Sequence, residues 1–250
     1  MAEDENEQST FTKPGFIAGA ALVAVLIIAG IVLTVVNVVG GDSDDDTASA
    51  PAPASSASAA PTATPTAAAG GESVCGLGGE ELSGTLTTAP DAEWQYQTTS
   101  AYPSSSEFGP IETAPAGYRF CFQHSPSGAL FAASNAVVQA FDNPGDTAWA
   151  DYFLSEGTYR EALLTAPADE GAASARLNIV GYRLLSYEGE TARVDVALRG
   201  SAQGETVTAS AVYDLVWEAG DWKADTSVAE PFSFAVIPDT SGYTLFTAGG

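Results

Sequence analysis

Two cysteines, Cys75 and Cys121, are the residues of this chain best suited to covalent chemistry. Neither belongs to a CxxC pair, which argues against a thiol redox motif, and two thiols are too few ligands for a structural zinc site. In a domain outside the cytoplasm they predict a disulfide. It would close a loop of about 46 residues and stabilise the fold by about 4 kcal/mol. Two separately buried thiols are the alternative.

His124 is the only histidine. Nucleophilic catalysis would require the fold to bring a serine and an acid to it, and the sequence contains no G-x-S-x-G elbow. The residue directly precedes a helix-start signal, Ser125-Pro126, where it either supports the helix cap or faces solvent. We therefore expect no catalytic role for His124.

Patterns for anions and metals are equally weak. The run Gly76-x-Gly78-Gly79 lacks the lysine and the spacing of a phosphate-binding loop. The aspartates between positions 42 and 46 lack the glycine turn and distant glutamate of an EF-hand, so we predict neither metal nor cofactor. With 8 Lys and Arg against 32 Asp and Glu, the net charge is -24. That charge repels phosphate backbones and argues against direct nucleic-acid binding.

An apolar segment near the N-terminus dominates the organisation of the chain. Residues 16–40 contain no charged side chain, and as a helix they would extend about 37 Å, more than the ~30 Å hydrocarbon core of a bilayer. A cleaved signal peptide is the alternative, with the small residues at 57–59 as a cleavage site. Signal peptides start basic and have shorter apolar runs, whereas residues 1–15 are acidic. We predict an uncleaved signal anchor that contacts membrane lipid.

The orientation of this anchor follows from Lys13, the only basic residue near either end of it. The positive-inside rule places residues 1–15 in the cytoplasm and the C-terminal part outside. Residues 41–73 are rich in Ala, Ser, Thr and Pro and predict a disordered linker. The chain is thus expected to be a single-pass cell-membrane protein whose residues 74–250 form one extracytoplasmic domain.

Helical signals occupy the first half of this domain. Residues 76–117 are rich in Gly, Pro, Ser and Thr, and we expect an irregular extension docked on the core. A short strand is predicted over 118–122. An apolar stripe then predicts a helix from Ser125-Pro126 to 143–145, followed by one that begins at Asp146 or Thr147 and a short one over 159–164.

From Arg176 onwards the apolar residues alternate, which predicts strands. The segment 177–187 changes its apolar face around Gly181, consistent with a bulge in a bent strand. Tight connections at Glu188-Gly189 and at 218–221 predict successive hairpins. The expected fold class is α+β, with helices packed on one curved antiparallel sheet.

This order of elements resembles a known fold. A meander whose last hairpin reads Val216-Trp217-Glu218-Ala219-Gly220-Asp221-Trp222-Lys223 resembles the nuclear-transport-factor-2-like cone, where a W-x-x-G-x-W turn is frequent. One membrane helix, a linker and such a domain resemble the inner-membrane assembly proteins of conjugative type IV secretion systems and their Gram-positive counterparts. The block from Gly117 to Ala133 resembles uncharacterised actinobacterial membrane proteins. The likeness covers residues 118–225.

The resemblance implies where an enzyme of this kind would hold its chemistry. Cone-fold enzymes use carboxylates and tyrosines in the cavity, which here selects Asp195, Asp214 and Tyr213. Neighbours on a strand point to opposite faces, so Tyr213 and Asp214 are not expected to share one pocket. A strand arginine, Arg193 or Arg199, is the expected partner of Asp214.

We therefore expect a non-enzymatic, membrane-anchored extracytoplasmic scaffold or assembly protein that contacts itself or other envelope proteins, including those of a conjugative transfer apparatus. A small-ligand-binding module that uses the concave face of the sheet is the alternative. An isomerase-like or hydrolytic enzyme would need a buried carboxylate facing such a cavity. Trp217 and Trp222 are expected in the core of the sheet and not at a ligand.

Overall fold

The computed structural model describes residues 73–166, 176–202 and 205–248. The predicted membrane segment, residues 16–40, lies outside these ranges, as do the tail before it and nearly all of the predicted linker. Within the described part of the chain, no helix is both long and apolar enough to cross a bilayer. The structure therefore concerns the domain predicted for residues 74–250.

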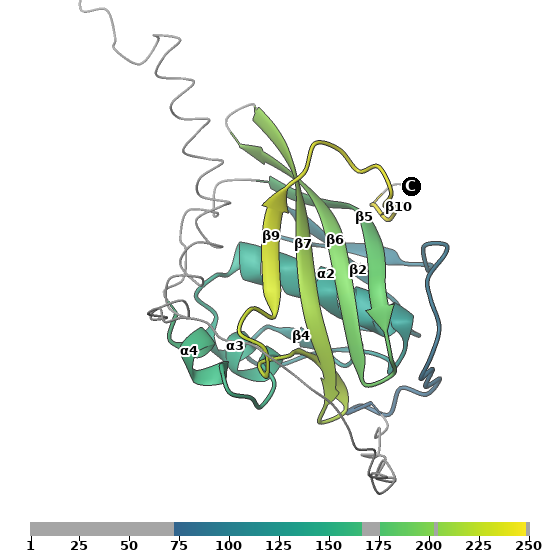
Figure 1. The fold of residues 1–250 in the computed structure, drawn as a ribbon, viewed down its shortest axis with the longest axis vertical. Coiled ribbons are helices and arrows are strands. Elements are labelled where there is room, and N and C mark those ends of the chain that lie inside the picture. The colour runs from purple at the N-terminus through teal and green to yellow at the C-terminus, as the bar shows by residue number, and fades with distance from the viewer. Residues whose placement is uncertain (1–72, 167–175, 203–204, 249–250) are drawn as a thin grey trace, which may run out of the picture.

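A six-stranded antiparallel sheet forms the framework of this domain (Figure 1). Five strands follow the order β10-β5-β6-β7-β8, and β9 also pairs with β7. The strands are β5 (Arg176–Tyr187), β6 (Thr191–Ala202), β7 (Glu205–Glu218), β8 (Asp221–Ala224), β9 (Phe232–Val236) and β10 (Thr244–Leu245). The alternating pattern and both predicted tight turns are confirmed.

The bulge predicted in the first long strand is also present. The pairing of β5 with β6 shifts register between Ile179 and Gly181, and again between Leu184 and Ser186. Such shifts bend a strand. Gly181 has a second reason to be glycine, because a Cβ there would lie 2.9 Å from the carbonyl oxygen of Thr244. The C-terminal segment can thus approach β5 closely and pair with it as β10.

Helix α2 (Pro126–Asp142) begins where the sequence predicts. The Ser125 hydroxyl accepts a hydrogen bond from the Gly128 amide, and Pro126 occupies the first turn, where its missing N–H costs nothing. A Cβ at Gly128 would lie 1.9 Å from the Gln123 carbonyl oxygen. Only glycine therefore allows the chain to turn this tightly into the helix.

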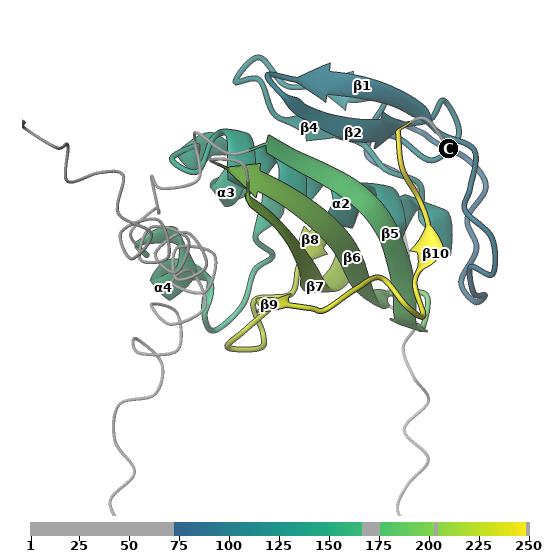
Figure 2. The ribbon, with the colours of Figure 1, turned by 90° about the horizontal axis from the view of Figure 1, so that it is seen from above.

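The domain has three layers, with α2 in the middle (Figure 2). One side of α2 packs on the curved sheet, and the other faces a hairpin of β1 (Glu93–Gln97) and β2 (Ser100–Ser104). Buried apolar side chains of α2 and of the sheet join in one core, including Leu130, Phe131, Val138, Tyr182, Val194 and Val196. The predicted α+β class is confirmed.

The hairpin corrects one sequence prediction. Residues 76–117 were expected to be irregular, yet they contain β1, β2 and β3 (Glu112–Thr113). The β1–β2 turn has Thr98 at φ 51°, in place of the glycine or asparagine that normally marks such a turn. β3 pairs with β4 (Arg119–Phe120), which is shorter than the strand predicted over 118–122.

Two short helices lie at the end of the sheet near β8. Helix α3 (Thr147–Phe153) is capped by Asp146, whose carboxylate accepts from the amides of Ala148 and Trp149. Helix α4 (Arg160–Leu164) follows. Leu154, directly after α3, forms a bridge with Ala224 of β8. Both predicted helices are therefore confirmed, and α3 is attached to the sheet.

Candidate functional site: buried polar clusters

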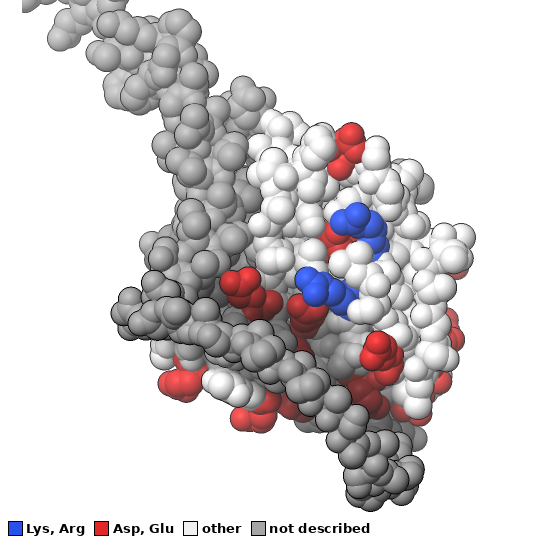
Figure 3. Space-filling model, viewed as in Figure 1, with Lys and Arg blue, Asp and Glu red and all other residues white. Residues whose placement is uncertain are grey.

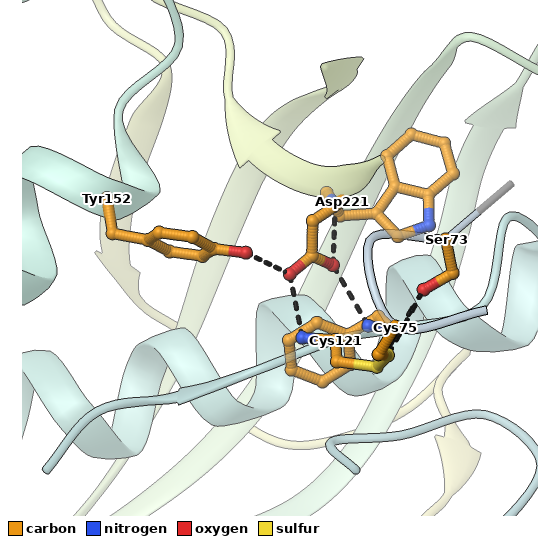
Figure 4. The surroundings of a disulfide bond; sticks show 7 residues. Ser73, Cys75, Cys121, Tyr152 and Asp221 are labelled. Carbon is orange, nitrogen blue, oxygen red and sulfur yellow. Dashed lines mark hydrogen bonds between the residues drawn. A yellow bond between two sulfur atoms is a disulfide. The ribbon is translucent and has the colours of Figure 1, made fainter. Parts of the chain in front are cut away.

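Cys75 and Cys121 form the predicted disulfide (Figure 4). Cys121 is buried, whereas Cys75 is exposed. The Ser73 hydroxyl lies 3.5 Å from Cys75 Sγ, and the next amide, of Val74, donates to the carbonyl oxygen of Gly220. The disulfide thus ties the start of the described domain to the residue directly after β4, and the Val74 hydrogen bond ties it to the β7–β8 turn.

The carboxylate of Asp221 lies beside this disulfide and is buried (Figure 4). It accepts four hydrogen bonds, from the amides of Cys121 (2.7 Å), Phe122 (2.9 Å) and Trp222 (3.0 Å) and from the hydroxyl of Tyr152 (2.6 Å). Burial raises the pKa of the Asp221 carboxyl, and the hydrogen bond from Tyr152 acts against that rise. We call these five residues the Asp221 cluster.

The backbone of Cys121 explains why a carboxylate is needed there. Cys121 has φ 76°, a left-handed conformation that costs a non-glycine residue about 1 to 3 kcal/mol. The carboxylate binds the amides on both sides of this bend, those of Cys121 and Phe122, and holds it in place. The Lys223 ammonium group donates to the Tyr152 carbonyl oxygen, so β8 is hydrogen-bonded to α3 as well. The arrangement is structural.

His124 is buried, which rules out exposure to solvent, one of the two positions that the sequence left open. Its ring stacks on Trp217, with centroids 4.1 Å apart. Nδ1 lies 3.0 Å from Glu80 Oε1, and Nε2 lies 3.2 Å from the carbonyl oxygen of Gly189. Ser125, and not His124, caps α2. The histidine joins the segment before β1 to the β5–β6 turn.

Asp195 lies on the face of the sheet turned away from α2, because its neighbours Val194 and Val196 point into the core. It is nevertheless buried. Arg183 Nε donates to it at 3.0 Å, the Ser210 hydroxyl at 2.7 Å and the Tyr243 hydroxyl at 2.8 Å. Tyr243, from the C-terminal segment, covers the Asp195 carboxylate.

The other two enzyme candidates lie apart from each other. Tyr213 packs in the core against Phe153, and burial raises the pKa of its hydroxyl. Asp214 points to the opposite face, where its Oδ1 lies 3.5 Å from Arg193 Nε. The predicted opposition of Tyr213 and Asp214 and the predicted pairing of Asp214 with Arg193 are both confirmed. The fold does not assemble Asp195, Asp214 and Tyr213 into one site.

Sequence reasoning missed a buried cation. Arg119 of β4 is buried next to α2, where its Nε donates to Asn135 Oδ1 at 2.6 Å and its guanidinium lies 3.8 Å from the centre of the Tyr102 ring. Burial lowers the pKa of Arg119 to about 10. The only sign of this buried cation in the sequence is an arginine inside the short strand predicted over 118–122.

The aspartates at 42–46, considered above as a metal site, lie outside the described residues. The described residues contain no group of three or more side chains that could hold a metal ion. Trp217 and Trp222 are both in the core of the sheet, as predicted. The indole N–H of Trp222 donates to the Gln123 carbonyl oxygen at 2.9 Å, just before α2.

Tyr243→Phe tests whether the C-terminal segment is held by Asp195. The change removes a hydroxyl that donates to Asp195 and accepts from Arg183, so we expect a loss of about 1 to 2 kcal/mol in the free energy of unfolding. Thermal unfolding measures it. Tyr96→Phe, at a side chain that is 69% exposed, is the matched control and should leave the melting temperature unchanged. Equal stability of both variants would contradict the assigned role.

The outer face of the sheet carries basic side chains next to acidic ones (Figure 3). Two of its arginines form ion pairs, Arg183 with Asp195 and Arg193 with Asp214. The strand β7 presents mainly small uncharged side chains on this face: Thr206, Thr208, Ser210 and Val212. A protein with a net charge of -24 thus has one surface on which like-charge repulsion between macromolecules is weak.

Comparison with known proteins identifies one related family. A family model described as a domain of unknown function, DUF8175, matches residues 53–245. No curated protein and no solved structure matches the chain. The matched range includes every helix and strand described above and residues 53–73 of the predicted linker.

Proposed function

The chain belongs to the DUF8175 family, a domain of unknown function, and from this premise we propose that it is a membrane-anchored extracytoplasmic scaffold or assembly protein. It acts through protein–protein contacts of the domain at residues 74–250. Its anchor is the apolar segment 16–40, and its partners are other copies of itself or other envelope proteins.

One observation carries this proposal: three buried side chains suited to acid–base chemistry hold the described part of the domain together. Asp221 holds the bend at Cys121, Asp195 binds Arg183 and the C-terminal segment, and His124 joins two segments. A catalytic acid or base has to reach a proton of its substrate. These three groups are instead bonded to parts of their own chain.

The packing of α2 weighs against the ligand-binding alternative. Such a module would use the face of the sheet that α2 covers. There Leu130 and Phe131 of the helix and Val194 and Val196 of the sheet belong to the same apolar core. Protein contacts on the outer surface are therefore the better-supported activity.

The place of the domain in the envelope follows from the sequence and its resemblance. A curved antiparallel sheet packed on α2 agrees with the cone-like fold that the W-x-x-G-x-W turn implies. An anchor, a linker and such a domain support a role like that of the inner-membrane assembly proteins of conjugative systems. Fully extended, the linker 41–73 reaches about 100 Å at ~3.1 Å per residue, enough for contacts far from the bilayer.

Protease treatment of intact cells tests the topology. In a full-length chain with a different epitope at each end, we expect loss of the C-terminal epitope and retention of the N-terminal one, since only residues 1–15 are predicted inside. Permeabilised cells, in which both epitopes are digested, provide the control. A protected C-terminal epitope, or a chain released into the medium, would contradict the proposed anchor.

Association is tested by cross-linking the full-length chain in its own membranes and identifying the products by mass. We expect a discrete product of defined composition, either a multiple of this chain or this chain with another envelope protein. The cross-link sites should map to residues 74–250. A chain recovered only as the uncross-linked monomer at native abundance would overturn the scaffold proposal.

A further inference from the structure

Strand β9 (Phe232–Val236) forms one lateral edge of the main sheet (Figure 1). It pairs with β7 from Phe232 opposite Tyr213 to Val236 opposite Ala209. Among the described strands it has no neighbour on its other side. An edge of this kind presents a row of peptide groups that another strand can pair with.

The flanking hydrogen bonds show which peptide groups face outwards. The backbone amide of Asp214 donates to the carbonyl oxygen of Pro231, and the backbone amide of Ile237 donates to the carbonyl oxygen of Thr208. Residues 231 and 237 thus direct their peptide groups to β7, and alternate residues of a strand do the same. The residues between them point their peptide groups away from β7: Phe232, Phe234 and Val236. No backbone partner for these three occurs within residues 73–166, 176–202 or 205–248.

The side chains of β9 do not protect this edge. Natural edge strands are commonly guarded by charged residues, yet the stretch from Pro231 to Pro238 contains none, and the nearest acids are Glu230 and Asp239. Phe232 and Phe234 are only partly buried, and Val236 is 50% exposed. A strand added here would therefore cover apolar side chains as well as unpaired peptide groups.

We propose that β9 pairs antiparallel with β9 of a second copy of this chain across a twofold axis, so that two sheets become one. This inference rests on the proposed scaffold function and names β9 as the surface through which two copies associate. With the axis at Phe234, the outward peptide groups of both strands face each other, and Phe232 lies opposite the partner's Val236. The exposed valine of each copy is then covered by a phenylalanine.

The charges that flank β9 permit a second copy as the occupant. In the register centred on Phe234, Glu230 lies opposite the partner's Pro238, and Asp239 lies opposite the partner's Ala229. Neither acid meets another acid, so this strongly acidic chain can approach itself along β9 without a direct repulsive pair. A twofold axis makes such a contact self-complementary, as in most homodimers.

The experiment compares Val236→Lys with Leu245→Lys in the full-length chain in detergent, with mass measured by sedimentation over a range of concentrations. Leu245 is 70% exposed on β10 at the opposite edge of the sheet, which makes it a matched control with the same charge change. We expect a wild-type dimer, an unchanged dimer for Leu245→Lys and a dissociation constant raised about tenfold or more for Val236→Lys.

Cysteine cross-linking tests the register independently. The two natural cysteines are bonded to each other, so introduced thiols have no competitor. A mixture of Ser233→Cys and Ala235→Cys chains should form a mixed disulfide, because the proposed register places position 233 opposite the partner's 235 in a closely spaced pair. A Leu245→Cys chain with either variant should form none.

The outcomes separate this inference from the function on which it rests. If the chain dimerises equally well with Val236→Lys and forms no mixed disulfide, the β9 contact is wrong, whereas the scaffold proposal stands. If the wild type is a monomer that still cross-links to another envelope protein, the second copy is the wrong occupant. A monomer that cross-links to nothing overturns both.

Discussion

Asp221→Ala is expected to lower the free energy of unfolding by about 3 to 5 kcal/mol. The carboxylate accepts hydrogen bonds from three amides and one hydroxyl. Its removal leaves these buried donors without a partner and releases the left-handed bend at Cys121. Each unsatisfied buried donor costs about 1 to 3 kcal/mol.

Urea unfolding followed by tryptophan fluorescence measures this loss. All four tryptophans lie in the domain, at positions 94, 149, 217 and 222, so the signal reports its unfolding. Asp214→Ala is the matched control: it removes a carboxylate from the neighbouring strand β7, where the ion pair with Arg193 is partly exposed, and should cost less than about 1 kcal/mol. Similar losses in both variants would refute the structural role of the Asp221 cluster.

Removal of the disulfide is expected to cost about 4 kcal/mol, because the unfolded chain regains the freedom of a loop of about 46 residues. The bond also fixes Cys121 next to Asp221, so its loss weakens the same corner of the domain. Cys75→Ser removes it with little disturbance to the core, since Cys75 is exposed and Cys121 is buried.

The same fluorescence experiment, performed with and without reductant, checks this prediction. Reduced wild type and Cys75→Ser should unfold at the same urea concentration, well below that of the oxidised wild type. Reductant should not affect Cys75→Ser, which serves as the internal control. Oxidised and reduced wild type that differ by less than about 1 kcal/mol would show that packing, and not the cross-link, holds this end of the domain.

The elements that sequence reasoning found share one property: their signals are local. Ser125 and Pro126 start α2, Asp146 caps α3, and the alternation of apolar residues marks β6 and β7. Each signal acts within a few residues, through a cap, a turn or a repeating apolar face. Their order alone therefore indicated an α+β fold with helices on a curved sheet.

The elements that were missed lack such signals. The β1–β2 hairpin turns at Thr98, without the usual glycine or asparagine. Strand β9 is short, and only its pairing with β7 makes it a strand. Both are defined by the surface on which they pack, which periodicity within a short segment does not report.

The sequence by itself determined the apolar segment 16–40, the acidic character, the disulfide partners and the class of fold, because each depends on composition or on neighbouring residues. Only the tertiary structure decided what the polar residues do. Asp221 bonds to an amide 100 residues earlier, and Tyr243 closes over Asp195 from the far end of the chain. Such partners are set by how sheets and helices pack, since residues distant in sequence meet only once the whole domain has folded.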